Sequence, residues 1–239
     1  MSLHALSNQE KELGQIFTPP WVFDYILDAV GYQGTAVLNK TIMEPACGDG
    51  AFLTEIVSRY VTAAQSVGWP AEKIKEGLER HIYGIEIDKD WCIQCIYNLN
   101  AVIEPLDIEV RWNVLNANAL TVGDYHGKMD YVVGNPPYVR VHNLDRATRK
   151  LLKENFFMCK KGMIDLYLAF YELGLLMLNN SGRLGYITPN SFMYNATSRA
   201  FREYVRENRL LKAIVNFKDT QLFDVSTYSA IVILDKGHR

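Results

Sequence analysis

The stretch 41-TIMEPACGDGAFL-53 starts as a short apolar strand, turns on two glycines and continues into a helical pattern. Gly48 and Gly50 allow the backbone to turn tightly and to approach a ligand before the helix begins. Beyond them, apolar side chains recur at helical spacing, at positions 52, 53, 56, 57 and 60. A strand that passes through a glycine turn into a helix is typical of α/β proteins, in which parallel strands alternate with helices.

The alternation continues along the rest of the chain. Strand-like runs follow at 81–88, 108–118, 129–135, 183–188, 210–217 and 228–236, and helical patterns occupy 89–102, 145–158, 163–179 and 197–208. Apolar strands separated by helices predict an α/β fold with a mostly parallel, seven-stranded sheet and helices on both faces. The last two strands have no helix between them, so we expect an antiparallel hairpin at one edge of the sheet.

The segment 14-GQIFTPPWVFDYILDAV-30 predicts a loop followed by a helix. Thr18 is a suitable N-cap for that helix, with Pro19 at its first helical position. We therefore expect an N-terminal helical segment over 1–35 and a sheet core over 41–239, together forming a single domain.

The composition is that of a globular protein, with 49% hydrophobic and 22% charged residues among 239. A net charge of −2 excludes a generally basic protein, so nucleic acid would have to bind a local basic face or another domain. The sequence has no apolar run long enough to span a membrane and no signal-peptide pattern at its start. We therefore expect a cytoplasmic protein without a membrane partner.

Four cysteines are present, and Cys92 and Cys95 form a C-x-x-C within a helical pattern. A metal site needs a second pair of ligands, and no other pair has suitable spacing. Core packing is therefore favoured over metal or redox chemistry, and no metal is expected. Unpaired thiols fit a reducing compartment.

Acidic residues, instead of a phosphate-binding pattern, follow the first strand. The turn is neither a P-loop nor a clean G-x-G-x-x-G, and the carboxylates of Glu44 and Asp49 suit a cationic or amine-bearing ligand. Glu86 ends the second strand, where α/β nucleotide-binding folds hold ribose hydroxyls, and Ile87 can lie against a base. After the third strand, Asn118 can hydrogen-bond an adenine amino group. These features favour S-adenosylmethionine, with another nucleotide, or no ligand, as the alternatives.

The fourth strand ends in 134-GNPPYVR-140, where two prolines stop the hydrogen-bonded ladder. Taken alone, this stretch is consistent with a simple turn. Together with the other motifs it resembles a known family, the amino-group DNA methyltransferases that act on adenine. The match is to the gamma arrangement of motifs, as in restriction–modification enzymes.

The motifs that carry the resemblance are GQIFTPP, EPACGDGAFL, GIEID and GNPPY. NPPY by itself is shared with the glutamine methyltransferases of release factors, whereas its combination with GQIFTP is more specific to the DNA enzymes. The resemblance implies a Rossmann-like, S-adenosylmethionine-dependent methyltransferase fold.

The resemblance also implies a cofactor site. Phe170 would face the adenine of the cofactor, although its helical position fits a core residue equally well, and Thr18 fits a plain helix cap. Asn118 stands where the family usually has Asp, so its adenine contact would carry no charge. The predicted cofactor-binding residues are Thr18, Glu44, Ala46, Gly48, Gly50, Glu86, Ile87, Asn118 and Phe170.

The predicted catalytic residues are Asn135, Pro136, Pro137 and Tyr138. The side-chain oxygen of Asn135 and the backbone carbonyl of Pro136 would accept the two hydrogens of the adenine amine, while the prolines stiffen the turn. Tyr138 would stack on the target base, and Phe223 would pack beside that base. The lysine sometimes found three positions after this phenylalanine is Ser226 here.

The expected function is methyl transfer from S-adenosylmethionine to the exocyclic amino group of adenine in double-stranded DNA, with the adenine flipped out of the duplex. A protein glutamine methyltransferase and a non-catalytic cofactor-binding subunit are the alternatives. Recognition of the DNA sequence is expected to need a domain or subunit absent from this chain. The basic run that follows NPPY, from Arg140 to Lys161, is either a solvated face or a phosphate-binding surface.

Overall fold

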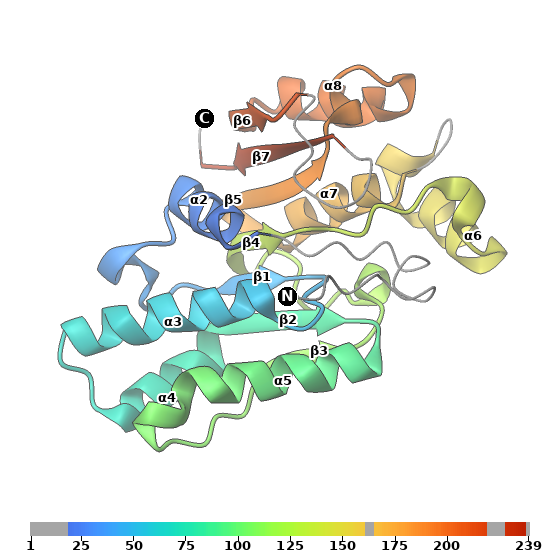
Figure 1. The fold of residues 1–239 in the computed structure, drawn as a ribbon. Helices are drawn as coiled ribbons and strands as arrows, with labels where there is room; N and C mark the ends of the chain where they lie inside the picture. Colours follow the sequence, from blue (N-terminus) through green and yellow to red (C-terminus); the bar gives the residue numbers. More distant parts are fainter. Residues whose placement is uncertain (1–18, 161–164, 219–227, 238–239) are drawn as a thin grey trace.

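The computed structural model describes residues 19–160, 165–218 and 228–237. These residues form a seven-stranded sheet with helices on both faces, as the sequence predicts (Figure 1). The strand order is β3-β2-β1-β4-β5-β7-β6. The strands are β1 (Ile42–Glu44), β2 (Ile82–Glu86), β3 (Asn113–Asn116), β4 (Met129–Gly134), β5 (Leu178–Pro189), β6 (Leu211–Asn216) and β7 (Ser229–Asp235).

The first five strands of that order pair in parallel, and β7 runs antiparallel to both β5 and β6. The predicted antiparallel pair of β6 and β7 at one edge is therefore confirmed. Because β6 is antiparallel to β7, it points the same way as the five parallel strands. The carboxyl ends of six strands thus lie along one edge of the sheet, and this edge carries the site described below.

The sheet separates two apolar cores. In β7, Ile231 and Ile233 enter one core, whereas Val232 and Leu234 enter the other, because side chains alternate along a strand. The first core is covered by α2 (Pro20–Val30), α3 (Ala51–Ser66), α4 (Ala71–His81) and α5 (Lys89–Ile103). The second is covered by α6 (Arg146–Asn155), α7 (Leu166–Met177) and α8 (Arg199–Glu207).

Arg59 connects two of the helices that cover the first core. Its guanidinium, on α3, pairs with Asp24 and Asp28 of α2 and with Glu55 of its own helix.

Short 3-10 helices connect many of these elements. They are η1 (Gly34–Val37), η2 (Glu104–Leu106), η3 (Ala119–Thr121), η4 (Val141–Asn143), η5 (Phe157–Cys159), η6 (Asn190–Met193) and η7 (Ala196–Ser198).

The structure differs from the predicted elements in several places. Strand β5 begins at Leu178, inside the predicted helix 163–179, and not at position 183. Helix α2 begins at Pro20, so Pro19 is the N-cap and not the first helical residue. Strand β3 covers only four residues of the predicted 108–118, because its pairing with β2 extends over no more than those four. Helix α4 was not predicted, since its buried face shows only Ile74, Gly77 and Leu78 among charged residues.

The cysteines Cys92 and Cys95 are buried on α5, in agreement with core packing. Within residues 19–160, 165–218 and 228–237, no group of three or more His, Cys, Asp or Glu side chains could hold a metal ion. Over the same residues, no helix has the length and apolar character needed to cross a membrane.

Candidate active site

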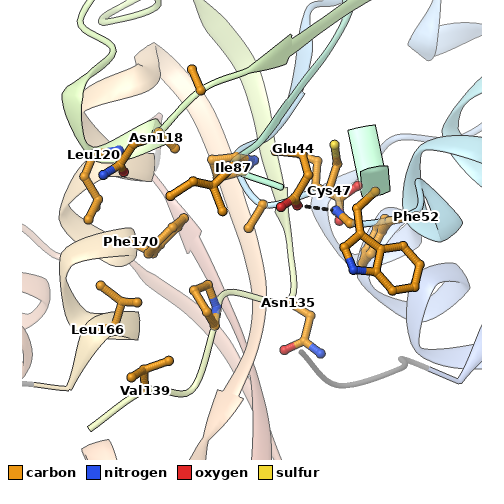
Figure 2. Close-up of a pocket in the computed structure, with 18 of the residues that line it drawn as sticks. Glu44, Cys47, Phe52, Ile87, Asn118, Leu120, Asn135, Val139, Leu166 and Phe170 are labelled. Carbon is orange, nitrogen blue, oxygen red and sulfur yellow. Dashed lines mark hydrogen bonds between the residues drawn. The ribbon is translucent and has the colours of Figure 1, made fainter. Parts of the chain in front are cut away.

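A pocket of about 330 Å³ opens at the carboxyl edge of the sheet (Figure 2). The residues after β1, β2, β3 and β4 form its floor, and the first turns of α3, α5 and α7 and the segment 143–148 line its sides. Figure 2 shows Asn118, Leu120 and Phe170 gathered at one end of the pocket, with Glu44, Cys47 and Phe52 toward the other. The predicted strand-end residues therefore do meet at one place.

The glycine turn between β1 and α3 has two left-handed residues, Gly48 with φ 53° and Gly50 with φ 81°. A side chain on Gly48 would extend into open space, so its backbone is accessible from the pocket that it lines. Gly50 serves packing instead: a Cβ there would lie 2.6 Å from the Sγ of Cys95 on α5. The turn thus needs glycine twice, once beside the pocket and once where it packs against α5.

Glu86 at the end of β2 is 5% exposed, and both of its carboxylate oxygens are hydrogen-bonded. Oε2 accepts from the Gly48 N–H at 2.8 Å, and Oε1 accepts from the Asp88 N–H at 2.9 Å. Burial raises the pKa of Glu86, and the backbone N–H donors oppose that shift. Glu86 therefore braces the glycine turn, a role that the sequence did not predict.

Glu44 is the most isolated acid of the pocket. It is 4% exposed, and its Oε2 atom is buried without a hydrogen-bond partner among the described residues. Burial raises the pKa of Glu44 well above its usual range, and the nearby Asp49 and Glu86 raise it further. A buried carboxylate without a partner costs free energy, so this end of the pocket suits a ligand that brings positive charge or N–H donors.

The opposite end of the pocket is an apolar slot. Ile87, which is 56% exposed, and Phe170, which is 6% exposed, both line it. Phe170 also belongs to the second core, so it is a core residue that reaches the pocket, and its contact with the adenine of the cofactor remains a prediction. Asn118 lines the slot, and its side-chain oxygen accepts from the Leu120 N–H at 3.1 Å. That oxygen has a second lone pair, which leaves it able to accept from a ligand.

The NPPY segment leaves the sheet where β4 ends. Asn135 and Pro137 line the pocket. Tyr138 is half-buried, and its hydroxyl donates to the Ile187 carbonyl near the end of β5 at 3.1 Å. This bond fixes the direction of the Tyr138 ring, and burial raises the pKa of its hydroxyl well above the usual value.

Of the described residues that the sequence singled out, Gly50, Pro136 and Tyr138 do not line the pocket. Thr18 and Phe223 lie outside the described residues, so their predicted contacts with the cofactor and the target base remain predictions. The predicted N-cap role of Thr18 is wrong, because the N-cap of α2 is Pro19. The predicted residues that do line the pocket are Glu44, Ala46, Gly48, Glu86, Ile87, Asn118, Asn135, Pro137 and Phe170.

Two parts of the pocket were missed. Trp91, in the first turn of α5, lines it, although the sequence interpretation of that helix considered only the packing of Cys92 and Cys95. The signal was available, since a helix that follows a strand-end acid starts at the ligand edge. The side chains of Asn143, Leu144, Asp145 and Thr148, at the start of α6, also line the pocket, and only tertiary packing brings them there.

Comparison with known proteins gives a consistent family. The family model of the Eco57I restriction-modification methylase matches residues 93–223, more than half of the chain. The Type II methyltransferase M.PaeR7I of Pseudomonas aeruginosa is 33% identical over 241 residues, which cover 93% of this chain and 40% of that protein. The chain spans only about 40% of the length of this and other curated relatives.

Solved structures show the same fold at low sequence identity. A protein from Listeria monocytogenes described as a class I S-adenosylmethionine-dependent methyltransferase superposes with a TM-score of 0.67, at 18% identity, over 97% of this chain and 62% of that one. The DrdV–DNA complex superposes with a TM-score of 0.73, at 16% identity, over 96% of this chain and 27% of that one. The Rossmann-like methyltransferase fold expected from the sequence is therefore confirmed.

Proposed function

The chain belongs to the Eco57I restriction-modification methylase family, and from this premise we propose that it transfers a methyl group from S-adenosylmethionine to the exocyclic amino group of adenine in DNA. The proposal treats residues 1–239 as one catalytic domain. It leaves recognition of the DNA sequence to a domain or subunit outside this sequence. The observation that carries the proposal is the meeting of Glu44, Glu86 and Asn135 in one pocket at the ends of three strands.

The charges of the pocket support S-adenosylmethionine as the cofactor. Glu44, Asp49 and Glu86 all line the pocket, and ionised carboxylates at these positions would repel a phosphate. S-adenosylmethionine has no phosphate and supplies a sulfonium-activated methyl group and an ammonium group. The buried Glu44 Oε2 offers an acceptor for that ammonium, and the open space at Gly48 lets a ligand approach the backbone.

The remaining cofactor contacts follow from the same placement. Glu86 would accept from the ribose hydroxyls on its free lone pairs, since each carboxylate oxygen uses only one for the backbone. Ile87 and Phe170 would hold the adenine ring between them, and the Asn118 oxygen would accept from the adenine amine.

The NPPY segment would prepare the target amine. The lone pair of an exocyclic adenine nitrogen is delocalised into the ring, so the enzyme must make this nitrogen more tetrahedral and aim it at the methyl group. The Asn135 side-chain oxygen and the Pro136 carbonyl would each accept one amine hydrogen. Because Pro136 and Pro137 restrict the backbone, these acceptors are fixed before the base arrives. Tyr138, held by Ile187, would offer its ring to the flipped base.

The function is tested by supplying the intact protein with S-adenosylmethionine labelled in its methyl group. We expect label in double-stranded DNA, at the N6 position of adenine after digestion to nucleosides. A release-factor peptide and DNA lacking adenine in one strand serve as competing substrates. Label in the peptide but not in DNA would replace the proposal by protein glutamine methylation.

Glu86→Ala is expected to weaken cofactor binding by about 1–3 kcal/mol, the range for hydrogen bonds to a charged group. Because Glu86 also braces Gly48, some of this loss would come from the turn alone. Calorimetry with a cofactor analogue lacking the ribose hydroxyls separates the loss of the ribose contact from the loss of support for the glycine turn. Wild type should bind the complete cofactor more tightly than the analogue, and Glu86→Ala should bind both alike. Equal discrimination by the two proteins would rule out the ribose contact.

A further inference from the structure

Lys218, just beyond the carboxyl end of β6, has a backbone conformation that lysine rarely adopts. Its φ is +51°, in the left-handed region that disfavours residues other than glycine, asparagine and aspartate. Such strain persists only where the surrounding structure holds it, and it is concentrated at functional sites. Lys218 is exposed, so no packing of its side chain accounts for the conformation.

Two asparagines hold the Lys218 backbone in place. Its N–H donates to the Asn216 side-chain oxygen at 3.0 Å, and its carbonyl accepts from the side-chain amide of Asn190 at 3.5 Å. The same Asn190 amide also donates to the Asn216 oxygen at 3.1 Å. Asn190 is only 7% exposed. Both backbone polar groups of the lysine are thus tied to one nearly buried network.

The network lies at the same edge of the sheet as the pocket. Asn190 directly follows β5, and the Tyr138 hydroxyl is bound to Ile187 of that strand, three residues earlier. Asn190 also donates its N–H to the Tyr228 carbonyl at 2.8 Å and accepts from the Tyr194 hydroxyl at 3.2 Å. The side chains of Tyr194 and Tyr228 are 67% and 48% exposed. A cation and two exposed aromatic rings are therefore gathered beside the NPPY strand end, the combination that nucleic acid favours.

We propose that Lys218 binds a backbone phosphate of the DNA strand that carries the target base, and that Asn190 and Asn216 are positioning residues that aim it. This inference rests on the proposed action on DNA and adds a contact residue to it. A lysine ammonium binds phosphate as a point charge and positions the duplex without reading its sequence.

The test replaces the charge without disturbing the backbone. Asn tolerates a positive φ, so Lys218→Asn removes the cation and keeps the left-handed conformation. Arg209 provides a matched control: it is exposed, has a φ of +53°, and precedes β6, at the opposite edge of the sheet. Binding of the intact protein to a mixed-sequence DNA duplex is measured at several salt concentrations, with Lys218→Arg as the rescue variant.

For Lys218→Asn we expect a plot of log affinity against log salt that is less steep by about one unit, and binding about 5- to 10-fold weaker at roughly 0.1 M salt, as for one lost phosphate contact. Lys218→Arg should restore both, and Arg209→Asn should change neither. If Lys218→Asn matches wild type or Arg209→Asn in slope and affinity, the inference is wrong, whatever the outcome of the methylation assay. A Lys218-dependent slope in a protein that methylates no DNA would retain the inference and refute the proposed function.

Discussion

Asn135→Ala is expected to lower the turnover number for methyl transfer by about 100-fold or more, comparable with removing one preorganised hydrogen-bonding group from other active sites. The proposed contact from the Asn135 oxygen to the target amine strengthens as the nitrogen becomes tetrahedral, so the loss should fall on the chemical step. Single-turnover methyl transfer by the intact protein, saturated with DNA and cofactor, measures that step apart from binding. DNA affinity should change less than the rate.

Two further variants make the Asn135 result specific. Asn135→Asp keeps an acceptor of nearly the same shape, so part of the activity should survive. Asn143 also lines the pocket but lies outside NPPY, so Asn143→Ala should change the rate only a few-fold. If Asn135→Ala methylates DNA at the wild-type rate once saturated, the NPPY segment is only a turn that ends β4.

Strands with a clear run of apolar residues could be predicted from the sequence, whereas elements with few apolar residues could not. The run 228–236 is almost continuously apolar, and β7 forms there with all seven of its residues buried between the two cores. Helix α4 shows two apolar side chains four residues apart among charged ones, so its periodicity was too short to recognise. Strand β3 is shorter than the predicted 108–118, mainly because it begins only at Asn113, since pairing length depends on the neighbouring strand and not on local propensity.

The candidate site shows the same division. The rule that ligands meet the carboxyl ends of parallel strands located Glu44, Glu86 and Asn135 from sequence, and all three line the pocket. The rule says nothing of which backbone groups a side chain already binds. One N–H donor to Glu86 belongs to Asp88, two residues along the chain, whereas only the folded turn brings the Gly48 N–H to 2.8 Å from the carboxylate. The segment 143–148 at the start of α6 likewise reaches the pocket through tertiary packing alone.

Glu44→Gln is expected to weaken binding of S-adenosylmethionine by at least about 30-fold, corresponding to about 2 kcal/mol, the lower end for truncating one partner of a buried charge pair. The buried Oε2 of Glu44 would be the acceptor for the cofactor ammonium, and the glutamine amide cannot offer the charge. Because burial raises the pKa of Glu44 above its unfolded value, a bound cation favours the ionised carboxylate over the protonated form. Affinity in wild type should therefore rise, with release of a proton, as the pH rises from the unfolded value of 4.5 through the folded-state pKa. The glutamine variant should lack this rise.

The same variant should stabilise the protein in the absence of cofactor. A carboxyl group whose folded-state pKa lies above its unfolded value of 4.5 contributes stability that is present below that value and is lost as the pH rises through the folded-state pKa. Wild type should therefore unfold more easily than Glu44→Gln near pH 8, and the difference should vanish toward pH 4.

Glu172 is a matched control for Glu44. It is 7% exposed and its pKa is also raised by burial, but its oxygens accept from the Phe157 and Met158 N–H groups, away from the pocket. Glu172→Gln should destabilise the protein and leave cofactor affinity unchanged, because it replaces an oxygen acceptor already in use by an amide donor. A Glu44→Gln protein that is less stable than wild type at pH 8 and binds the cofactor equally well would show that this carboxylate serves the fold and not the ligand.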